Sequence, residues 1–290
     1  MTFAGQPGLA PARPQRARVV TDPGRRRMLL IELLIVMAVF PLPFVLNAVA
    51  ALVTAIVDPK QTEARFPVVI TGHELLSLPF DVLLYGIQLA APALVLYLLW
   101  RNGEGAASIG LTVDRPRLKG DAALLLPVFA AAFFGPLGVL QVILATAGVH
   151  GFNPSTTGVP HIYAVVALVA GVQAGIVEEI VVLGYLVRRL EQLGLRSGPL
   201  IAVAVLVRVS YHLYYGAAVI AFIVWAAVSV ILYRRFRRLW PFIVVHILWD
   251  VTVGLAAIFN TSVLLVAGLL LFPATIAFTS AWWSSVEATT

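Results

Sequence analysis

Three short segments in the second half of the chain carry paired ionisable side chains in otherwise apolar surroundings. In chain order they hold Glu178 and Glu179, Arg208 and His212, and His246 and Asp250. Residues four apart share one face of an α-helix, so the second and third pairs each present both side chains on one side. Adjacent helical residues diverge by about 100° around the axis. We therefore expect one glutamate to serve catalysis and the other to take a structural partner.

This combination of side chains predicts activation of a water molecule. A carboxylate and a nearby imidazole can share a water's protons, so Glu178 or Glu179 acting with His212 would prepare it for attack on an amide carbonyl. His246 and Asp250 on a facing helix would stabilise the developing oxyanion. The plainer alternative is a buried polar network that only holds the helices together.

A zinc site is the second alternative, because two histidines and a carboxylate form a typical zinc ligand set. The ligands would be Glu178, His212 and His246. No His-Glu-x-x-His sequence occurs anywhere in the chain. We therefore favour a site without metal or other cofactor.

The elements that position these residues are predicted to be transmembrane helices. The 290 residues are 60% hydrophobic and only 12% charged, and the mean hydropathy is +0.95, which leaves too little polar surface for a soluble globule. Apolar runs close to the ~20 residues that span a bilayer recur along the chain. The fold class is thus an all-α integral membrane protein, a bundle of about eight transmembrane helices. The predicted spans are Met28–Val57, Leu76–Trp100, Asp121–Val149, His161–Val187, Gly198–Tyr214, Ala217–Tyr233, Pro241–Phe259 and Val263–Trp283.

The distribution of basic residues predicts the orientation. Of the 20 lysines and arginines, all but Lys60, Arg65 and Arg208 fall in the amino-terminal tail and in the loops of one side. Basic residues favour the cytoplasmic side, so both termini are expected in the cytoplasm of a multi-pass plasma membrane protein. The net charge of +6 then indicates contact with anionic lipid and not with nucleic acid.

The chain is predicted to contain one folded domain. Residues 1–27 are expected to be a disordered, basic cytoplasmic tail, and residues 28–290 a single membrane domain. Pro41 and Pro43 are expected to kink the first span. Tyr185 and Tyr211 are expected to pack in the bundle, although either could line a substrate groove.

The three paired segments resemble the motifs of the CPBP family, the CAAX proteases and bacteriocin-processing enzymes, also called the Abi family. Glu178-Glu179, followed by Gly184-Tyr185-Leu186, is similar to the first motif. His212 matches the histidine of the second, and His246-x-x-x-Asp250 matches the third in full. The resemblance covers about residues 173–251, the motif core of a CPBP-like membrane domain.

The resemblance implies an all-helical intramembrane endopeptidase whose site opens toward the cytosolic side. It implies Glu178 as the general base, His212 as its partner in activating water, and His246 with Asp250 as the oxyanion-stabilising pair. Glu179 would support them, and no cofactor would be bound, although an older interpretation of the family is metalloendopeptidase activity. The substrate would be a peptide or protein, and a bacterial plasma membrane is the expected location. We do not extend the family's prenylated substrates to this chain.

Two positions depart from the family motifs. The arginine of the first motif is Leu183 here, and the phenylalanine of the second is Arg208. A buried glutamate without a cation and a buried arginine without an anion are both unfavourable. Our hypothesis is that Arg208 supplies the missing guanidinium from the neighbouring helix and balances Glu179.

The sequence therefore predicts an endopeptidase that hydrolyses a peptide bond near the cytoplasmic membrane face. A proton-coupled transporter, in which the same residues form an ion or substrate site, is one alternative. A non-catalytic binding or immunity protein on the same scaffold, consistent with the Leu183 departure, is the other.

Overall fold

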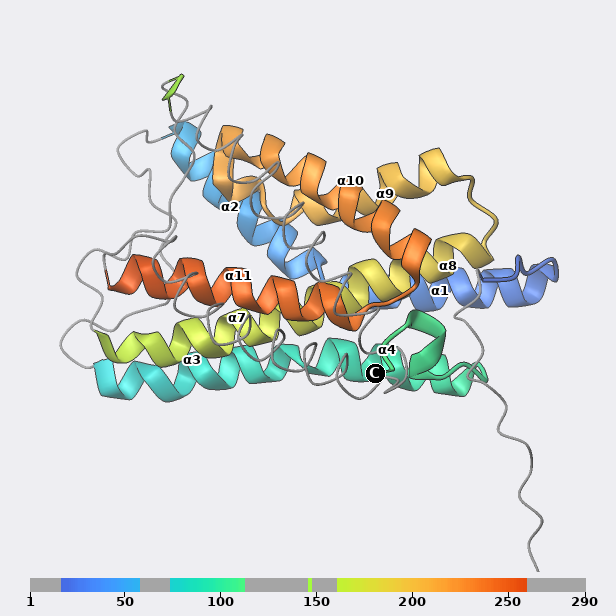
Figure 1. Ribbon diagram of the computed structural model, residues 1–290, viewed down its shortest axis with the longest axis horizontal. Helices are drawn as coiled ribbons and strands as arrows, with labels where there is room; N and C mark the ends of the chain where they lie inside the picture. The colour runs from blue at the N-terminus through green and yellow to red at the C-terminus, as the bar shows by residue number, and fades with distance from the viewer. Residues whose placement is uncertain (1–16, 58–73, 113–145, 148–160, 260–290) are drawn as a thin grey trace, which may run out of the picture.

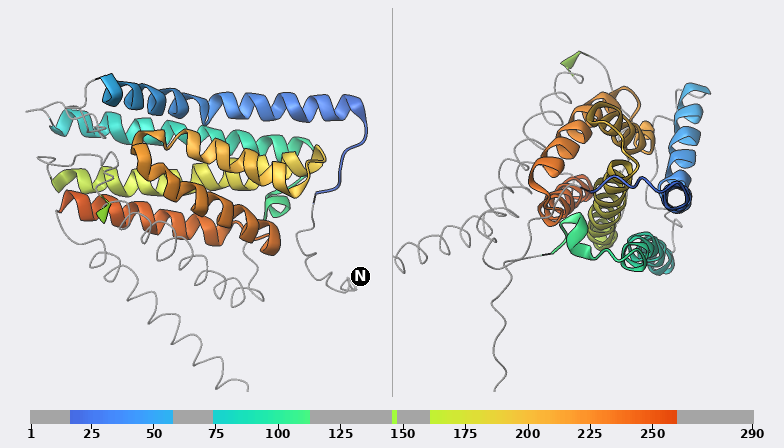
Figure 2. Two further views of the ribbon diagram at one scale, coloured as in Figure 1. Left: turned by 90° about the horizontal axis from the view of Figure 1, so that it is seen from above. Right: turned by 90° about the vertical axis from the view of Figure 1, so that its right-hand side faces the viewer.

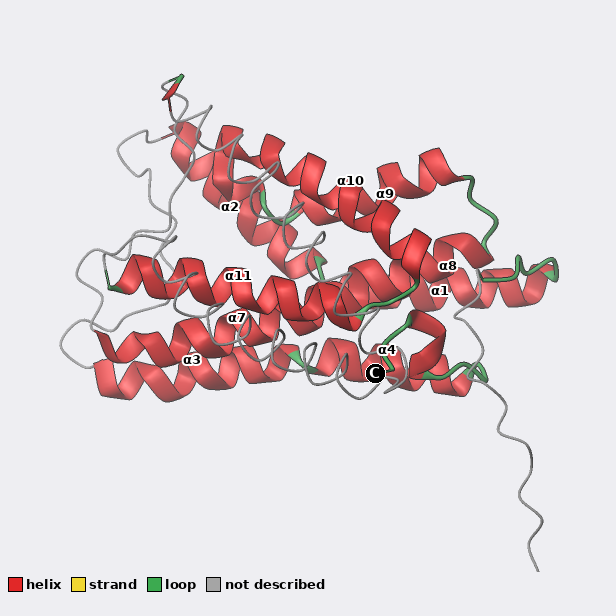
Figure 3. Cartoon of the chain, in the orientation of Figure 1, coloured by secondary structure: helices red, strands yellow, loops and turns green. Residues whose placement is uncertain are grey.

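The computed structural model describes residues 17–57, 74–112, 146–147 and 161–259, and all regular elements in these ranges are helical (Figures 1 and 3). This confirms the predicted all-α class. The α-helices are α1 Pro23–Val39, α2 Leu42–Val57, α3 Glu74–Gln88, α4 Ala90–Arg101, α7 Ala164–Glu178, α8 Val187–Gln192, α9 Ser197–Ser210, α10 Val219–Phe236 and α11 Trp240–Ile258. Short 3₁₀ segments cover Ala106–Ile109, His161–Tyr163 and Leu213–Ala218, and a π-helix, Glu179–Leu186, joins α7 to α8.

Several of these helices are long and apolar enough to cross a membrane. Within the described ranges three qualify, Leu78–Arg101, His161–Gln192 and Trp240–Ile258, and a fourth results if the bent pair α1 and α2 counts as one span. The predicted spans Asp121–Val149 and Val263–Trp283 fall almost entirely outside the described residues. The apolar helices thus support a membrane protein, while the count of eight and the cytoplasmic termini stay predictions.

The first predicted span is two helices. α1 and α2 meet at an angle of 46°, at the prolines that were expected to kink it. α1 also begins earlier than expected, because Asp22 caps it by accepting a hydrogen bond from the Arg25 amide at 2.6 Å and Pro23 occupies its first turn. Residues 23–27 of the predicted tail are therefore helical, which corrects that boundary.

Helix α7 occupies the centre of the bundle. It packs against α11 and against α3. Figure 1 and the left view of Figure 2 show α7 between these two helices. α9 packs against α10. Val177 of α7 and Leu183 and Leu186 of the π-helix belong to the apolar core. The segment that carries the glutamate pair is therefore fixed by packing on both sides of the pair in the sequence.

A group of ion pairs, here called the ionic cluster, ties the basic ends of the helices together. It consists of Glu104 and Glu191 with Arg188, Arg189, Gln192, Arg234 and Arg237. The start of α1, the end of α4 and α8 lie at this same end of the bundle (Figure 1). This agrees with the prediction that their basic residues share one side.

Glu104 is the most heavily hydrogen-bonded carboxylate of the ionic cluster. It accepts from Arg188 at 2.6 Å, from Arg189 at 3.2 Å and from Gln192 at 2.5 Å. Partial burial raises the pKa of Glu104, but the hydrogen bond from Arg188 and the two nearby guanidinium charges outweigh this effect, so its pKa lies below the ordinary value.

Candidate active site

Close backbone contact between α7 and α11 brings two of the three motifs together. A Cβ added at Gly171 would lie 2.9 Å from the Val251 amide nitrogen, and one added at Gly175 would lie 2.9 Å from that of Ile247. These glycines are four residues apart on one face of α7, the small-residue spacing that lets membrane helices approach closely. The glutamates at the end of α7 therefore face the His246–Asp250 turn of α11.

The adjacent glutamates point in different directions, as expected. Glu179 is buried, with an exposed fraction of 1%. Its Oε1 accepts from Arg208 Nη2 at 2.5 Å and contacts His246 Nδ1 at 2.7 Å. The Arg208 guanidinium also lies 4.3 Å from the centre of the Trp225 ring. The predicted pairing of Arg208 with Glu179 is thus confirmed.

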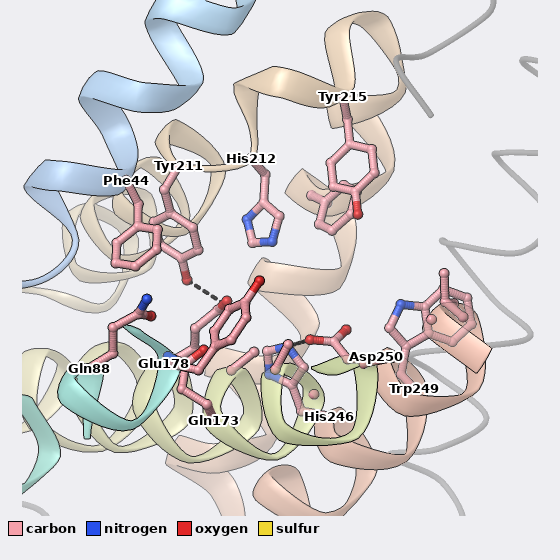
Figure 4. A pocket seen from close by; sticks show the side chains of 18 of the residues that line it. Phe44, Gln88, Gln173, Glu178, Tyr211, His212, Tyr215, His246, Trp249 and Asp250 are labelled. Carbon is pink, nitrogen blue, oxygen red and sulfur yellow. Dashed lines mark hydrogen bonds and ion pairs between the residues drawn. The ribbon is translucent and has the colours of Figure 1, made fainter. Parts of the chain in front are cut away.

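Glu178, in contrast, lines a cavity of about 290 Å³. The Tyr211 hydroxyl donates to its Oε2 at 2.7 Å (Figure 4). Neither Arg208 nor any other cation among the described residues forms an ion pair with it. Glu178 is thus the glutamate that remains available to the contents of the cavity.

His212 faces the same cavity, and its Nε2 has no hydrogen-bond partner among the described residues. Its Nδ1 lies 2.8 Å from the carbonyl oxygen of Arg208; since a carbonyl only accepts, Nδ1 carries the hydrogen and Nε2 is the acceptor. The neighbouring ring of Phe222 stacks on the imidazole with centroids 4.5 Å apart. Hydrogen bonding and stacking together fix the ring orientation.

His246 lies between two carboxylates. Besides its contact with Glu179, its Nε2 is 3.5 Å from Asp250 Oδ2, one helical turn along α11. Asp250 is partly exposed and lines the cavity. Both ring nitrogens of His246 therefore face carboxylate oxygens.

The structure brings all four predicted catalytic residues to one cavity: Glu178, His212, His246 and Asp250. The predicted supporting residues, Glu179 and Arg208, lie directly behind it. Leu183 is elsewhere, buried in the apolar core. In the part of the chain that the structure describes, no three acidic or histidine side chains form a group that could hold a metal ion. The roles of these residues stay predictions.

Two residues of this site were not predicted: Trp225 covers Arg208, and Gln88, from the distant helix α3, lines the cavity. Tyr211, for which packing was preferred over a place in a substrate groove, lines the cavity and donates a hydrogen bond to Glu178. A weak signal existed for Tyr211, which immediately precedes His212. For Gln88 and Trp225 the sequence gives no local signal, because their positions depend on how the helices pack.

The comparison with known families agrees with the site. Residues 160–252 match the family model described as type II CAAX prenyl endopeptidase Rce1-like. The matched segment contains every predicted catalytic residue, and the predicted resemblance to the CPBP family is confirmed over it. No curated protein and no solved structure matches the chain.

Proposed function

We propose that this chain, through its Rce1-like segment, is an intramembrane endopeptidase that hydrolyses a peptide bond with a water molecule activated by Glu178 and His212. One observation carries the proposal. A carboxylate without a cationic partner among the described residues and an imidazole with a free acceptor nitrogen face one cavity within a helical membrane bundle. General base catalysis of amide hydrolysis requires acceptors of this kind.

In the proposed reaction, Glu178 takes a proton from water as the water oxygen attacks the carbonyl carbon. His212 Nε2 accepts the second hydrogen of the water and fixes its position. Tyr211, which occupies one oxygen of Glu178, leaves the other for the water. When the tetrahedral intermediate collapses, the C–N bond breaks and Glu178 returns its proton to the leaving amine nitrogen.

The oxyanion is proposed to be stabilised by His246, with Asp250 and Glu179 orienting the ring. The contact with Glu179 at 2.7 Å holds the imidazole, and the 3.5 Å separation from Asp250 leaves the Nε2 side open to a closer oxygen. Arg208 compensates Glu179 and thereby fills the electrostatic role of the motif arginine that Leu183 replaces.

The zinc alternative fits this arrangement poorly. Glu178, His212 and His246 would be the ligands, but among the described residues no three acidic or histidine side chains form a group that could hold one metal ion. A catalytic zinc ion typically needs about three protein ligands. We therefore propose catalysis without a metal, and a chelator that leaves the rate unchanged is the expected result.

The proposed substrate is a peptide or protein segment at the membrane. The matched family is described as a prenyl endopeptidase, so prenylated and unprenylated peptides are compared in the test. From the basic-residue bias we propose a cytoplasmic amino terminus, contact with anionic lipid and cleavage near the cytoplasmic face. From the topology and the Arg-rich, small-residue composition we propose a bacterial plasma membrane.

The test is peptide cleavage by purified protein in liposomes of phosphatidylethanolamine and phosphatidylglycerol. The probes are a library of quenched fluorogenic peptides, together with prenylated and unprenylated peptides that end in Cys-aliphatic-aliphatic-X. Glu178→Gln is expected to lower kcat by about 10²–10⁴-fold without lowering the unfolding temperature, whereas Glu104→Gln in the ionic cluster should keep the rate. A wild type that cuts none of these probes while driving solute flux would contradict the proposal and favour the transporter.

A further inference from the structure

Gln88 is a polar residue of the cavity wall that the water-activating machinery does not use. It comes from the end of α3 and lines the cavity together with Glu178. Figure 4 shows its side chain on the Glu178 flank of the pocket, below Phe44. Its Oε1 is buried and accepts no hydrogen bond from the described residues. Buried polar atoms without a partner are uncommon, so this oxygen needs an explanation.

The main chain is also interrupted at this point. Leu89 separates α3 from α4, and Pro92 stands four residues after Gln88. Because proline has no N–H, it cannot give the Gln88 carbonyl the hydrogen bond that a continuous helix would supply. The main-chain carbonyl of Gln88 therefore lacks the hydrogen bond to residue i+4 that an ordinary α-helical residue has.

A second carboxamide lies on the facing helix. Gln173 of α7 is buried and lines the same cavity. A carboxamide offers one acceptor oxygen and two N–H donors, which match the C=O and N–H groups of a peptide main chain without adding charge. Most of the remaining wall is aromatic or aliphatic, including Phe40, Phe44 and Trp249.

We propose that Gln88 is a substrate-binding residue that holds the main chain of the peptide beside the scissile bond. Its Oε1 accepts from a substrate N–H and its Nε2 donates to a substrate C=O, so the peptide lies extended across Glu178. Gln173 supports this from α7. The inference rests on the proposed peptidase function and deepens it by naming a conformational requirement on the substrate. In a helical segment the main-chain N–H and C=O groups are already hydrogen-bonded to each other and cannot bind Gln88. The site therefore selects peptides that are unwound at the cleavage point.

Replacing Gln88 by methionine tests the proposal, because this side chain keeps the shape and loses the amide. With the best-cut fluorogenic peptide, Gln88→Met should raise KM roughly tenfold and change kcat little, as expected when a binding contact is lost. Its unfolding temperature should stay the same or rise, because a buried oxygen without a donor has been removed. Gln88→Asn should recover part of the affinity. Ile87→Met, on the exposed neighbouring residue, is the matched control and should change nothing.

The same peptide remade with single N-methyl groups around the scissile bond provides the second measurement. Wild type should lose roughly tenfold in kcat/KM at one N-methylated position, and Gln88→Met should lose nothing further there. A wild type that cuts no peptide defeats the proposed function itself. A wild type that cuts, combined with a Gln88→Met variant that keeps its KM or is less stable, overturns the inference and leaves the function intact.

Discussion

Two groups of carboxylates in the molecule, those of the ionic cluster and those of the candidate site, are neutralised to different degrees. In the ionic cluster, Glu104 accepts hydrogen bonds from two arginines and a glutamine, and Glu191 pairs with two arginines. In the candidate site, Glu179 has one arginine and one histidine, and Glu178 has a tyrosine hydroxyl. Fully paired carboxylates hold helices together. A carboxylate with fewer partners, beside a cavity, is able to exchange protons with its contents.

The two places also differ in how many partners would remain if one were removed. Glu104 would keep Arg189 if Arg188 were lost. Glu179 would keep no guanidinium among the described residues if Arg208 were lost. The candidate site is therefore more sensitive to a single substitution than the ionic cluster, which can be measured directly.

The largest effect is expected for Arg208→Ala. This change leaves the buried Glu179 without its guanidinium, and breaking a buried pair by removing one partner typically destabilises by about 3–5 kcal/mol. Arg188→Ala should cost only about 1 kcal/mol, because Arg189 still faces Glu104. Unfolding of the detergent-solubilised variants, monitored by circular dichroism during titration with a denaturing detergent, measures both.

The double variant Arg208→Ala with Glu179→Ala is the control, because it removes both charges and should recover most of the lost stability. Equal destabilisation by Arg208→Ala and Arg188→Ala would contradict the comparison. An Arg208→Ala variant with normal folding and unchanged activity would also refute the idea that Arg208 replaces the motif arginine.

A smaller effect is expected for Tyr211→Phe. The hydroxyl donates to Glu178 Oε2 at 2.7 Å, so its loss frees one carboxylate oxygen and loosens the position of the general base. We expect kcat to fall roughly tenfold, the size of one lost hydrogen bond to a charged group, with KM nearly unchanged. Steady-state kinetics in liposomes measures this. A Tyr211→Phe variant with wild-type kcat would show that the hydroxyl serves packing alone.

Much of the candidate site was predictable because helical geometry is local. The four-residue spacing of His246 and Asp250 and the divergence of Glu178 from Glu179 follow from the turn of a helix. The pairing of Arg208 with Glu179 followed from charge balance in an apolar medium. The first two predictions used only the spacing of neighbouring residues, and the third used general energetics together with the two departures from the CPBP motifs.

The remainder depends on tertiary structure. The π-helix Glu179–Leu186 begins at the second glutamate, and its residues, mostly apolar, carry no pattern that distinguishes it from an α-helix. α9 ends at Ser210, and the turn that follows presents Tyr211 and His212 together. Gln88 reaches the cavity only because α3 packs against α7. Contacts between residues so far apart in the sequence produce no pattern in the local spacing of residues, so they could not be predicted from it.

The smallest predicted effect is a loss of stability at acid pH, and it reports on the ionic cluster alone. Because the folded pKa of Glu104 lies below its ordinary value of 4.5, its ionised form stabilises the fold fully above that pH. This contribution declines as the pH falls below 4.5 and is lost once the pH passes through the folded pKa. At pH 7, Glu104→Gln should therefore unfold about 2–4 °C below wild type, and the two unfolding temperatures should converge as the pH falls through the folded pKa of Glu104. A difference that stays constant with pH would show that the Glu104 contacts stabilise by shape and not by charge.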